Sequence, residues 1–116
     1  MILKTEIKRD YFLNGNIRSE TPYKNGRING VGKDYFLNGN IRSEIPFKND
    51  KIHGIQKYYN ENGKLWYEIP FKNGEKHGLK KEYYDEKYKC TGLFFWINDL
   101  AFGIDIFCID TDIIIG

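Results

Sequence analysis

The chain has 116 residues, of which 41% are hydrophobic, 29% charged and 16% aromatic, and its formal net charge is +2. These proportions indicate one globular domain with a modest core and exclude a disordered chain. Nine Tyr and eight Phe, with alanine at position 101 only, favour strands over helices.

The charge is spread unevenly along the chain. Residues 1–90 carry 18 Lys and Arg against 12 Asp and Glu, whereas residues 91–116 carry four Asp and no Lys or Arg. A weakly basic body with an acidic end suits electrostatic contact with another protein. It falls short of the clustered basic surface of a nucleic-acid binder, so we expect no nucleic-acid partner.

A repeat of 24 residues organises the chain. The letters YFLNGNIRSE stand at 11–20 and again at 35–44, and residues 11–34 match 35–58 at 16 of 24 positions. A third unit, 59–82, keeps the Gly, Glu, Pro and Lys-Asn positions of the first two. A degenerate fourth unit follows at 83–107 and overlaps an apolar, acidic tail at 104–116. We interpret residues 1–116 as a single repeat domain.

Each unit contains two turn signals about eleven residues apart. The first is Asn14-Gly15, Asn38-Gly39 and Asn62-Gly63; the second is Asn25-Gly26, Asn49-Asp50 and Asn73-Gly74, with Asn98-Asp99 in the fourth unit. Asn-Gly tolerates positive φ at both central residues of a type I′ turn, the turn whose twist matches two paired strands. The spacing therefore predicts a series of β-hairpins.

The segments between turns alternate with a period of two, which is typical of half-buried strands. In the segment 41–47, Ile41, Ser43, Ile45 and Phe47 share one face, and Arg42, Glu44 and Pro46 the other. The sequence predicts an all-β meander of about eight short antiparallel strands. Pro22, Pro46 and Pro70 recur once per unit and mark a strand end, a bulge or a gap in pairing. Gly30, Gly54 and Gly78 predict a kink or a close backbone approach.

One apolar face has to be covered by curling of the sheet, by the tail or by a second copy. The tail alternates apolar residues with Asp105, so we expect it to pair in the sheet or to form a homodimer contact. Because Asp105, Asp110 and Asp112 interrupt it, it does not resemble a membrane span. The start of the chain has no signal-peptide pattern, and Cys90 and Cys108 are expected to be free thiols, with one disulfide left open. A cytoplasmic protein is the expectation.

The repeat resembles the bacterial MORN-repeat variant, through YFLNGNIRSE, YKNGRING and YNENGKLWYEIPFKNGEKHG. The resemblance covers residues 8–82 well and 83–103 poorly. It implies an extended sheet of hairpins that binds partners without catalysis. It further implies an antitoxin or immunity-type protein of a bacterial toxin–antitoxin system, or a module that binds phospholipid or serves as a scaffold. The shared positions are structural, so the resemblance assigns no binding residue.

No catalytic, metal or cofactor site is expected. His53 and His77 occupy one repeat position, and two strands separate them by roughly 10 Å, too far for one zinc ion. Glu20, Glu44 and Glu68 form a column that cross-strand pairing with Arg or Lys explains. No nucleophile–base pair or phosphate loop accompanies them, so we expect no enzyme.

Departures from the repeat suggest a contact surface in the third unit. Trp66 replaces Arg18 and Arg42 on the expected polar face, Tyr58 replaces Asp34, and Tyr88 replaces a turn glycine. Exposed Trp and Tyr beside basic residues are typical contact anchors, although the fourth unit or the tail could cover them. The predicted partner-binding residues are Tyr58, Trp66, Tyr67 and Tyr88, with Arg18 and Arg42 at the rim.

Three functions are consistent with this surface. The first is a non-catalytic module that docks on a partner protein, most specifically an antitoxin or immunity-type protein whose partner is a toxin. The second is a module for phospholipid or a membrane surface. The third is a structural repeat protein that associates with itself.

Overall fold

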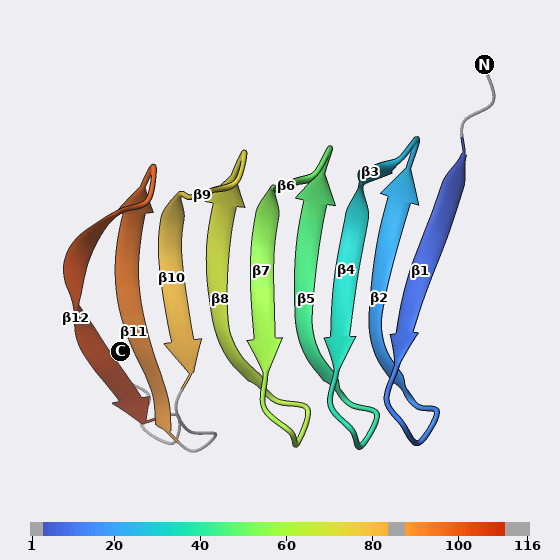
Figure 1. The fold of residues 1–116 in the computed structure, drawn as a ribbon. Helices are drawn as coiled ribbons and strands as arrows, with labels where there is room; N and C mark the ends of the chain where they lie inside the picture. Colours follow the sequence, from blue (N-terminus) through green and yellow to red (C-terminus); the bar gives the residue numbers. More distant parts are fainter. Residues whose placement is uncertain (1–3, 84–87, 111–116) are drawn as a thin grey trace.

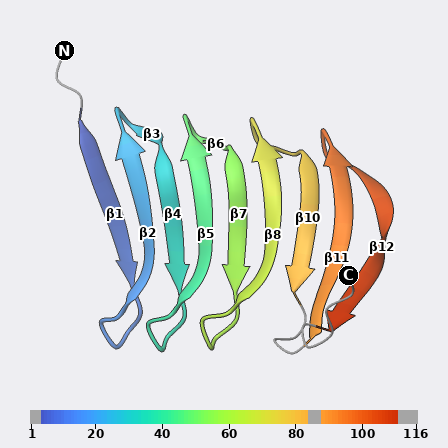
Figure 2. The same ribbon diagram turned by 180° about the vertical axis from the view of Figure 1, so that it is seen from behind.

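The computed structural model describes the backbone of residues 4–83 and 88–110, and the side chains of residues 4–83 and 96–100. The described residues form a single antiparallel sheet without helices, which confirms the predicted all-β hairpin repeat (Figures 1 and 2). None of them forms a helix that could cross a membrane.

The long strands follow one another across the sheet in chain order, each beside its sequence neighbour (Figure 1). They number nine rather than about eight: β1 (Thr5–Tyr11), β2 (Ile17–Lys24), β4 (Gly30–Tyr35), β5 (Ile41–Lys48), β7 (Gly54–Tyr59), β8 (Leu65–Lys72), β10 (Gly78–Tyr83), β11 (Tyr88–Ile97) and β12 (Leu100–Asp110). The second turn of each unit lies at the top of the sheet in Figure 1 and is called the upper turn below. After each of the first three upper turns, a strand of two residues pairs back onto the preceding long strand. These short strands are β3 (Arg27–Ile28) on β2, β6 (Lys51–Ile52) on β5 and β9 (Glu75–Lys76) on β8.

The second turn of each unit is the predicted type I′ turn. Asn25 and Gly26 have φ of 52° and 80°, and Asn49 and Asp50 have φ of 47° and 70°. The same pair of positive values recurs at 73–74 and at 98–99. The degenerate fourth unit therefore keeps this turn.

The first turn differs from the prediction. Only its glycine has positive φ, as at Gly15 with 91°, whereas Asn14 does not. The amide of Gly15 donates to the carbonyl of Phe12 (2.9 Å), and the amide of Phe12 donates to the carbonyl of Asn16 (2.8 Å), which closes a wider loop. The side-chain oxygen of Asn14 accepts the amide of Asn16 (2.9 Å). Asparagine acts here as a side-chain acceptor and not as a left-handed residue.

A bulge sits at the same place in each of the first three long hairpins. The register shifts at Asp10/Tyr11, at Asp34/Tyr35 and at Tyr58/Tyr59. Each shift skips one residue on the following strand, and the skipped residues are Arg18, Arg42 and Trp66. Strict alternation of side chains between faces therefore ends at these three positions.

The prolines mark a gap in pairing, one of the three outcomes that the sequence left open, and the closing glycines pack against the proline rings. Between β2 and β4 only Ser19 and Glu20 have partners, and the carbonyl of Pro22 accepts the amide of Asn29 (3.0 Å) instead. A Cβ atom on Gly30 would lie 3.1 Å from Cγ of Pro22. Glycine at this position, with a φ of 116°, leaves room for the proline ring and adopts a backbone conformation that other residues rarely take.

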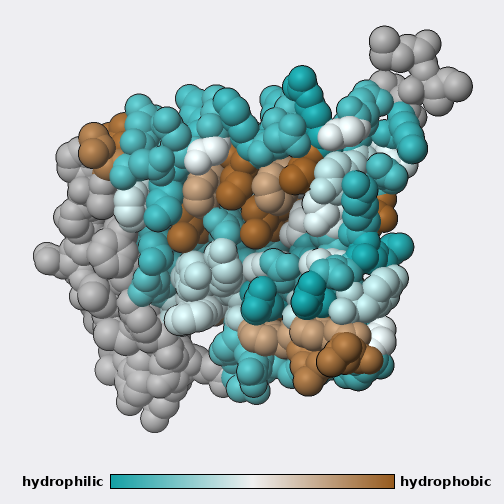
Figure 3. Space-filling view, in the orientation of Figure 1, coloured by the Kyte–Doolittle hydropathy of each residue, from teal (hydrophilic) through white to brown (hydrophobic). Residues whose placement is uncertain are grey.

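The two faces of the sheet differ in chemistry. The Phe face carries Ile45, Phe47, Ile69 and Phe71, and the Glu face carries Glu20, Glu44 and Glu68. Figure 3 looks onto the Phe face, where hydrophobic side chains form a band across the upper half of the middle strands. Among the described residues Ile69, 8% exposed, is the only buried hydrophobic side chain. Most of the Phe face is therefore half-buried in a single-layer sheet.

The backbone of residues 104–110 lies in β12, beside β11 at the edge of the sheet. This part of the tail pairs in the sheet, which was one of the two predicted outcomes. The register sets Cys90 opposite Cys108, and their side chains, like residues 111–116, lie outside the described part.

A ladder of tyrosine–glutamate hydrogen bonds crosses the Glu face. Tyr35 donates to Glu20, and the same contact recurs one unit on between Tyr59 and Glu44, and then between Tyr83 and Glu68. The hydrogen bond from Tyr35 and the guanidinium of Arg9, 3.0 Å away, lower the pKa of Glu20. The same hydrogen bond raises the pKa of Tyr35 to about 12. The Arg partner of Glu20 was predicted, whereas the tyrosine was not.

The upper turns also hydrogen-bond from unit to unit. The amide of Asp50 donates to the carbonyl of Ile28 (2.9 Å), and the Asp50 carboxylate accepts the amide of Ile28 (2.8 Å). Gly74 and Asp99 repeat the first of these bonds onto Ile52 and Lys76 (2.8 and 3.0 Å). Each hairpin therefore satisfies backbone groups left open by the hairpin before it.

Candidate functional site

One row of side chains on the Phe face changes its chemistry along the sheet. Each of the first three long hairpins contributes three positions at its bulge. These are Asp10, Arg18 and Ser19 in the first, Asp34, Arg42 and Ser43 in the second, and Tyr58, Trp66 and Tyr67 in the third. The register places the three sets side by side, because Ser19 lies opposite Asp34 and Ser43 lies opposite Tyr58.

The first two sets are polar, and each contains one contact between its own side chains. Arg18 forms an exposed ion pair with Asp10. The hydroxyl of Ser43 donates to the carboxylate of Asp34 (2.8 Å), and Ser43 is 1% exposed. The Arg18 guanidinium holds the pKa of Asp10 below its usual range, chiefly through their hydrogen bond. These contacts fix the row locally and leave little apolar surface for a partner.

The third set is an aromatic cluster, which we define as Tyr58, Trp66 and Tyr67. The rings of Tyr58 and Tyr67 stack with centroids 4.5 Å apart and planes 19° apart. Trp66 meets Tyr67 edge-on, with centroids 5.0 Å apart and planes 75° apart. Both arrangements are favoured for aromatic pairs. Trp66 remains 50% exposed, so it presents a large apolar surface to solvent.

The bulge explains why Trp66 joins this cluster. Strict alternation assigns it to the polar face, opposite to Tyr67, and this assignment is wrong. Because Trp66 is the residue skipped between the pairs Tyr58–Tyr67 and Tyr59–Leu65, its side chain turns to contact Tyr67.

Charged and polar groups surround the aromatic cluster. The ammonium group of Lys80 lies 5.2 Å from the centroid of the Tyr67 ring and 2.7 Å from the Glu82 carboxylate. On the other side, the buried amide of Gln56 donates to the hydroxyl of Tyr58. Burial raises the pKa of Tyr58, the nearby Asp34 carboxylate adds to that rise, and Arg42 opposes it. The Tyr58 hydroxyl is therefore neutral at physiological pH and available as a donor.

The structure brings together three of the six predicted contact residues. Tyr58, Trp66 and Tyr67 form the aromatic cluster, and Arg42 lies exposed on the neighbouring strand. Arg18 lies in the first hairpin, engaged with Asp10. Tyr88 begins β11, and its side chain lies outside the described part. Their role in binding stays a prediction.

Two residues of the site were missed by sequence reasoning. Gln56 and Lys80 occupy one repeat position, which is Lys8 and Gly32 in the first two hairpins. Lys8 lies over the ring of Tyr23 (4.7 Å) much as Lys80 lies over Tyr67. This position varies from unit to unit, and that variation was the available signal.

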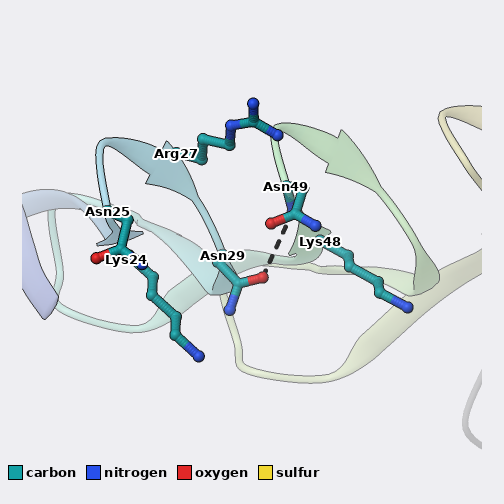
Figure 4. A pocket seen from close by; sticks show the side chains of 6 residues that line it. All are labelled: Lys24, Asn25, Arg27, Asn29, Lys48 and Asn49. Carbon is teal, nitrogen blue, oxygen red and sulfur yellow. Dashed lines mark hydrogen bonds between the residues drawn. The ribbon is translucent and has the colours of Figure 1, made fainter. Parts of the chain in front are cut away.

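A second candidate surface lies at the upper turns. A shallow pocket there is lined by Lys24, Asn25, Arg27, Asn29, Lys48 and Asn49 (Figure 4). Asn29 accepts the backbone amide of Asn49 (3.4 Å), and Lys24 and Lys48 project to one side while Arg27 points away from them. None of the three cations has an ion-pair partner among the described residues. The pocket could hold an anionic group.

The histidine at the equivalent turn position is structural. The ring nitrogen Nδ1 of His53 accepts the amide of Asn73 (3.2 Å), as Asn29 does for Asn49 one unit earlier. The described residues contain no group of three or more His, Cys, Asp or Glu placed to hold a metal ion.

Comparison with known proteins identifies the repeat. No curated protein and no solved structure matches the chain. The family described as MORN repeat variant matches residues 7–25, 28–49 and 52–73, more than half of the chain. Each match spans one long hairpin: β1–β2, β4–β5 and β7–β8. MORN repeats are modules that bind proteins or membranes. Sequence repeat, hairpin register and family match agree, and the chain belongs to the MORN repeat variant family.

Proposed function

We propose that this chain is a protein-binding module whose partner docks on the aromatic cluster of the Phe face. The observation that carries the proposal is the change of one row from polar residues to Tyr58, Trp66 and Tyr67 on an unchanged backbone. Hairpin formation does not require aromatic residues there, since the first two hairpins fold with Asp, Arg and Ser.

The cluster has the properties of a contact centre. Trp66 is half exposed and held in place by Tyr67, so its ring loses little freedom when it is covered. The apolar band of Ile45, Phe47, Ile69 and Phe71, half-buried except at the buried Ile69, continues the apolar surface above it. Arg42, Lys80 and Glu82 supply charges around it. An aromatic centre with a charged rim is the usual composition of a protein interface.

More specifically, we propose an antitoxin or immunity-type role, in which the covered partner is a bacterial toxin. The resemblance to the bacterial variant of the repeat motivates this step. The scaffold also suits it, because a rigid sheet can cover a partner's active surface without chemistry of its own. Non-catalytic binding is part of the proposal.

The test exchanges the third set for the second. A triple variant Tyr58→Asp, Trp66→Arg and Tyr67→Ser restores the row that the second hairpin already carries at 34, 42 and 43. The wild-type protein, used as bait in lysate from its own cells, should retain a partner identified by mass spectrometry. The triple variant should lose it while keeping a cooperative thermal transition.

A matched control sits on the opposite face. Ile55 is 51% exposed, close to the exposure of Trp66, and points to the Glu face opposite Pro70. Ile55→Asn should retain the partner if the Phe face is the docking surface. Loss with both variants, or retention with both, contradicts the proposed surface. The antitoxin role requires that expression of the captured partner alone arrests growth and that co-expression of wild-type chain, but not the triple variant, relieves the arrest.

A second candidate, binding of an anionic lipid surface, is favoured by the pocket of Lys24, Arg27 and Lys48 at the upper turns. Vesicles containing phosphatidylserine should then sediment with the protein at low salt and release it at high salt. Lys24→Gln with Lys48→Gln should abolish this binding. Binding that is unchanged in this double variant, or equal on neutral vesicles, contradicts the second candidate.

A further inference from the structure

The outer edge of β1 has no partner strand among the residues that the structure describes. One edge of β1 pairs with β2, and the sheet order puts β1 at the end of the series. Its last two residues, Asp10 and Tyr11, repeat Asp34 and Tyr35 of β4. Its earlier residues do not, because Glu6 and Lys8 stand where β4 has Gly30 and Gly32.

These departures create an alternating charge pattern on one face of the edge. The register sets Glu6, Lys8 and Asp10 opposite Tyr23, Thr21 and Ser19, so all three side chains lie on the Phe face. Lys4 precedes them with the same spacing of two. Along the edge the charges therefore run positive, negative, positive, negative, and Ile7 lies at the centre of the series.

The backbone at Ile7 points outward. Ile7 lies opposite Pro22, whose nitrogen has no hydrogen and whose carbonyl accepts Asn29 on the far side of β2. The pair Ile7–Pro22 is therefore not a hydrogen-bonded pair, and the amide and carbonyl of Ile7 face away from β2. Alternation gives Thr5 and Arg9 the same outward direction.

We propose that β1 pairs in antiparallel fashion with β1 of a second copy of this chain, in the register centred on Ile7. In that register the two Ile7 residues exchange amide–carbonyl hydrogen bonds. Glu6 lies opposite Lys8 of the second copy, and Lys4 lies opposite Asp10, so every facing pair on the Phe face joins unlike charges. The two exposed Ile7 side chains, each 53% accessible in the single chain, cover one another on the Glu face.

The alternation of sign favours this register over its neighbours, because it gives the largest number of unlike pairs. A shift of two residues would set Lys4 against Lys8 and Glu6 against Glu6, and a parallel in-register pair would oppose like charges throughout. A shift of four residues keeps unlike charges opposite one another but leaves only two of the four charged positions paired. Charges on an edge strand can also prevent pairing with another chain. If that is their role here, the protein should be a monomer at all concentrations. A seven-residue edge offers a small interface, so the dimer should form in a concentration-dependent manner.

Sedimentation velocity over a wide concentration range tests the proposal. The wild-type mass should rise from 13.7 kDa toward twice that value. Glu6→Lys alone sets the introduced lysine against Lys8 of the second copy, and Lys8→Glu alone sets the introduced glutamate against Glu6. Each variant by itself should therefore remain a monomer. An equal mixture of the two variants restores unlike pairs at both positions and should recover the dimer.

A backbone variant provides an independent readout. Ile7→Pro removes the outward amide, which β2 does not use, and should abolish the dimer while the circular dichroism spectrum and thermal transition stay those of a folded sheet. Glu61→Lys, an exposed loop residue with the same change of charge as Glu6→Lys, is the control that should dimerise as wild type does.

Three outcomes would overturn the proposal. The first is a wild-type protein that remains a monomer at all concentrations. The second is a dimer that still forms in the Ile7→Pro variant. The third is a mixture of Glu6→Lys and Lys8→Glu that fails to associate although each variant is folded. A dimer that survives Ile7→Pro would place the contact elsewhere, for example at the C-terminal end of the sheet.

Discussion

The second and third hairpins show that one backbone can carry two different chemistries at its bulge. In the second, Ser43 donates to Asp34 and Arg42 is exposed, and in the third, Tyr58 and Tyr67 stack and Trp66 meets Tyr67 edge-on. The strands have the same lengths, and the register shifts at the same place. The bulge therefore belongs to the scaffold, and the residues placed on it are free to vary. Binding surfaces in this repeat are best sought at the skipped residue and its two neighbours.

The largest expected effect concerns the glycine that closes each hairpin. A Cβ atom would approach Cγ of the facing proline to 3.1 Å at Gly30, 3.0 Å at Gly54 and 2.8 Å at Gly78, where φ is also +119°. Gly78→Ala should lower the free energy of unfolding by about 3 kcal/mol, and Gly30→Ala by somewhat less. Gly15→Ala, with nothing within 4 Å of its Cβ, should cost about 1 kcal/mol. Urea unfolding measures the series, and equal losses at 15 and 78 would contradict it.

The next largest effect is a loss of stability at alkaline pH. It should be similar in the second and third hairpins, because both contribute a tyrosine to the ladder on the Glu face. The pKa is about 12 for Tyr35, chiefly through its hydrogen bond to Glu20, and about 12 for Tyr59, chiefly through burial. Both values exceed the ordinary tyrosine pKa of 10.0. A raised pKa stabilises the fold below pH 10, and this stabilisation is lost as the pH rises through 12. The midpoint of urea unfolding should fall over that window.

The double variant Tyr35→Phe and Tyr59→Phe checks this assignment. It should lose most of the alkaline pH dependence while it unfolds cooperatively near neutral pH. If the wild-type and variant curves fall in parallel between about pH 10 and pH 12, other groups cause the alkaline unfolding.

A smaller effect compares the two kinds of row directly. A double-mutant cycle with Tyr58→Leu and Tyr67→Leu should give a coupling of about 1 kcal/mol, because stacked rings contribute that much beyond their burial. A cycle with Asp34→Ala and Ser43→Ala should give a similar value, because the hydrogen bond involves a charged acceptor in a buried setting. Absence of coupling between Tyr58 and Tyr67 would show that the stacked geometry does not persist in solution.

The smallest effect concerns the first hairpin. The side chains of Arg18 and Asp10 are both more than half exposed, so solvent screens their ion pair. Arg18→Met should therefore leave the midpoint of urea unfolding unchanged within experimental error. The same substitution at Arg42, which has no ion-pair partner among the described residues, serves as the comparison. A clear fall of the midpoint at Arg18 but not at Arg42 would show that this ion pair does more than an exposed contact can.

Much of the fold could be predicted from local chemistry. The Asn-Gly dipeptide at 25–26 specified a type I′ turn, and even Asn98-Asp99 in the degenerate unit kept it. Pro22 predicted a strand end, a bulge or a gap in pairing, and the structure has the gap. Gly30 predicted a kink or a close approach, and it packs against the ring of Pro22. The same dipeptide misled at 14–15, because there the asparagine side chain captures a backbone amide and the loop widens. Whether an Asn-Gly pair forms a type I′ turn, as at 25–26, or a wider loop, as at 14–15, therefore cannot be read from the dipeptide alone.

The candidate site was predictable in part. Tyr58, Trp66 and Tyr67 stood out because the repeat supplied its own reference, and the structure places them together. The prediction that Trp66 lies on the polar face was wrong, because alternation with a period of two does not include the skipped residue of a bulge. The contacts of Lys80 and Gln56 depend on strand order across the sheet, which periodicity within one strand does not contain.

The hydrogen bonds between successive upper turns have a consequence for how such a chain can grow. Since Asp50 binds the backbone of Ile28, and Gly74 that of Ile52, each new copy of the 24-residue unit finds its acceptors already in position. Duplication of a segment such as 11–34 would lengthen the sheet by one hairpin, and the backbone hydrogen bond between successive upper turns could form again at the new junction. A sheet that can be extended one hairpin at a time in this way is compatible with the near-identity of residues 11–34 and 35–58.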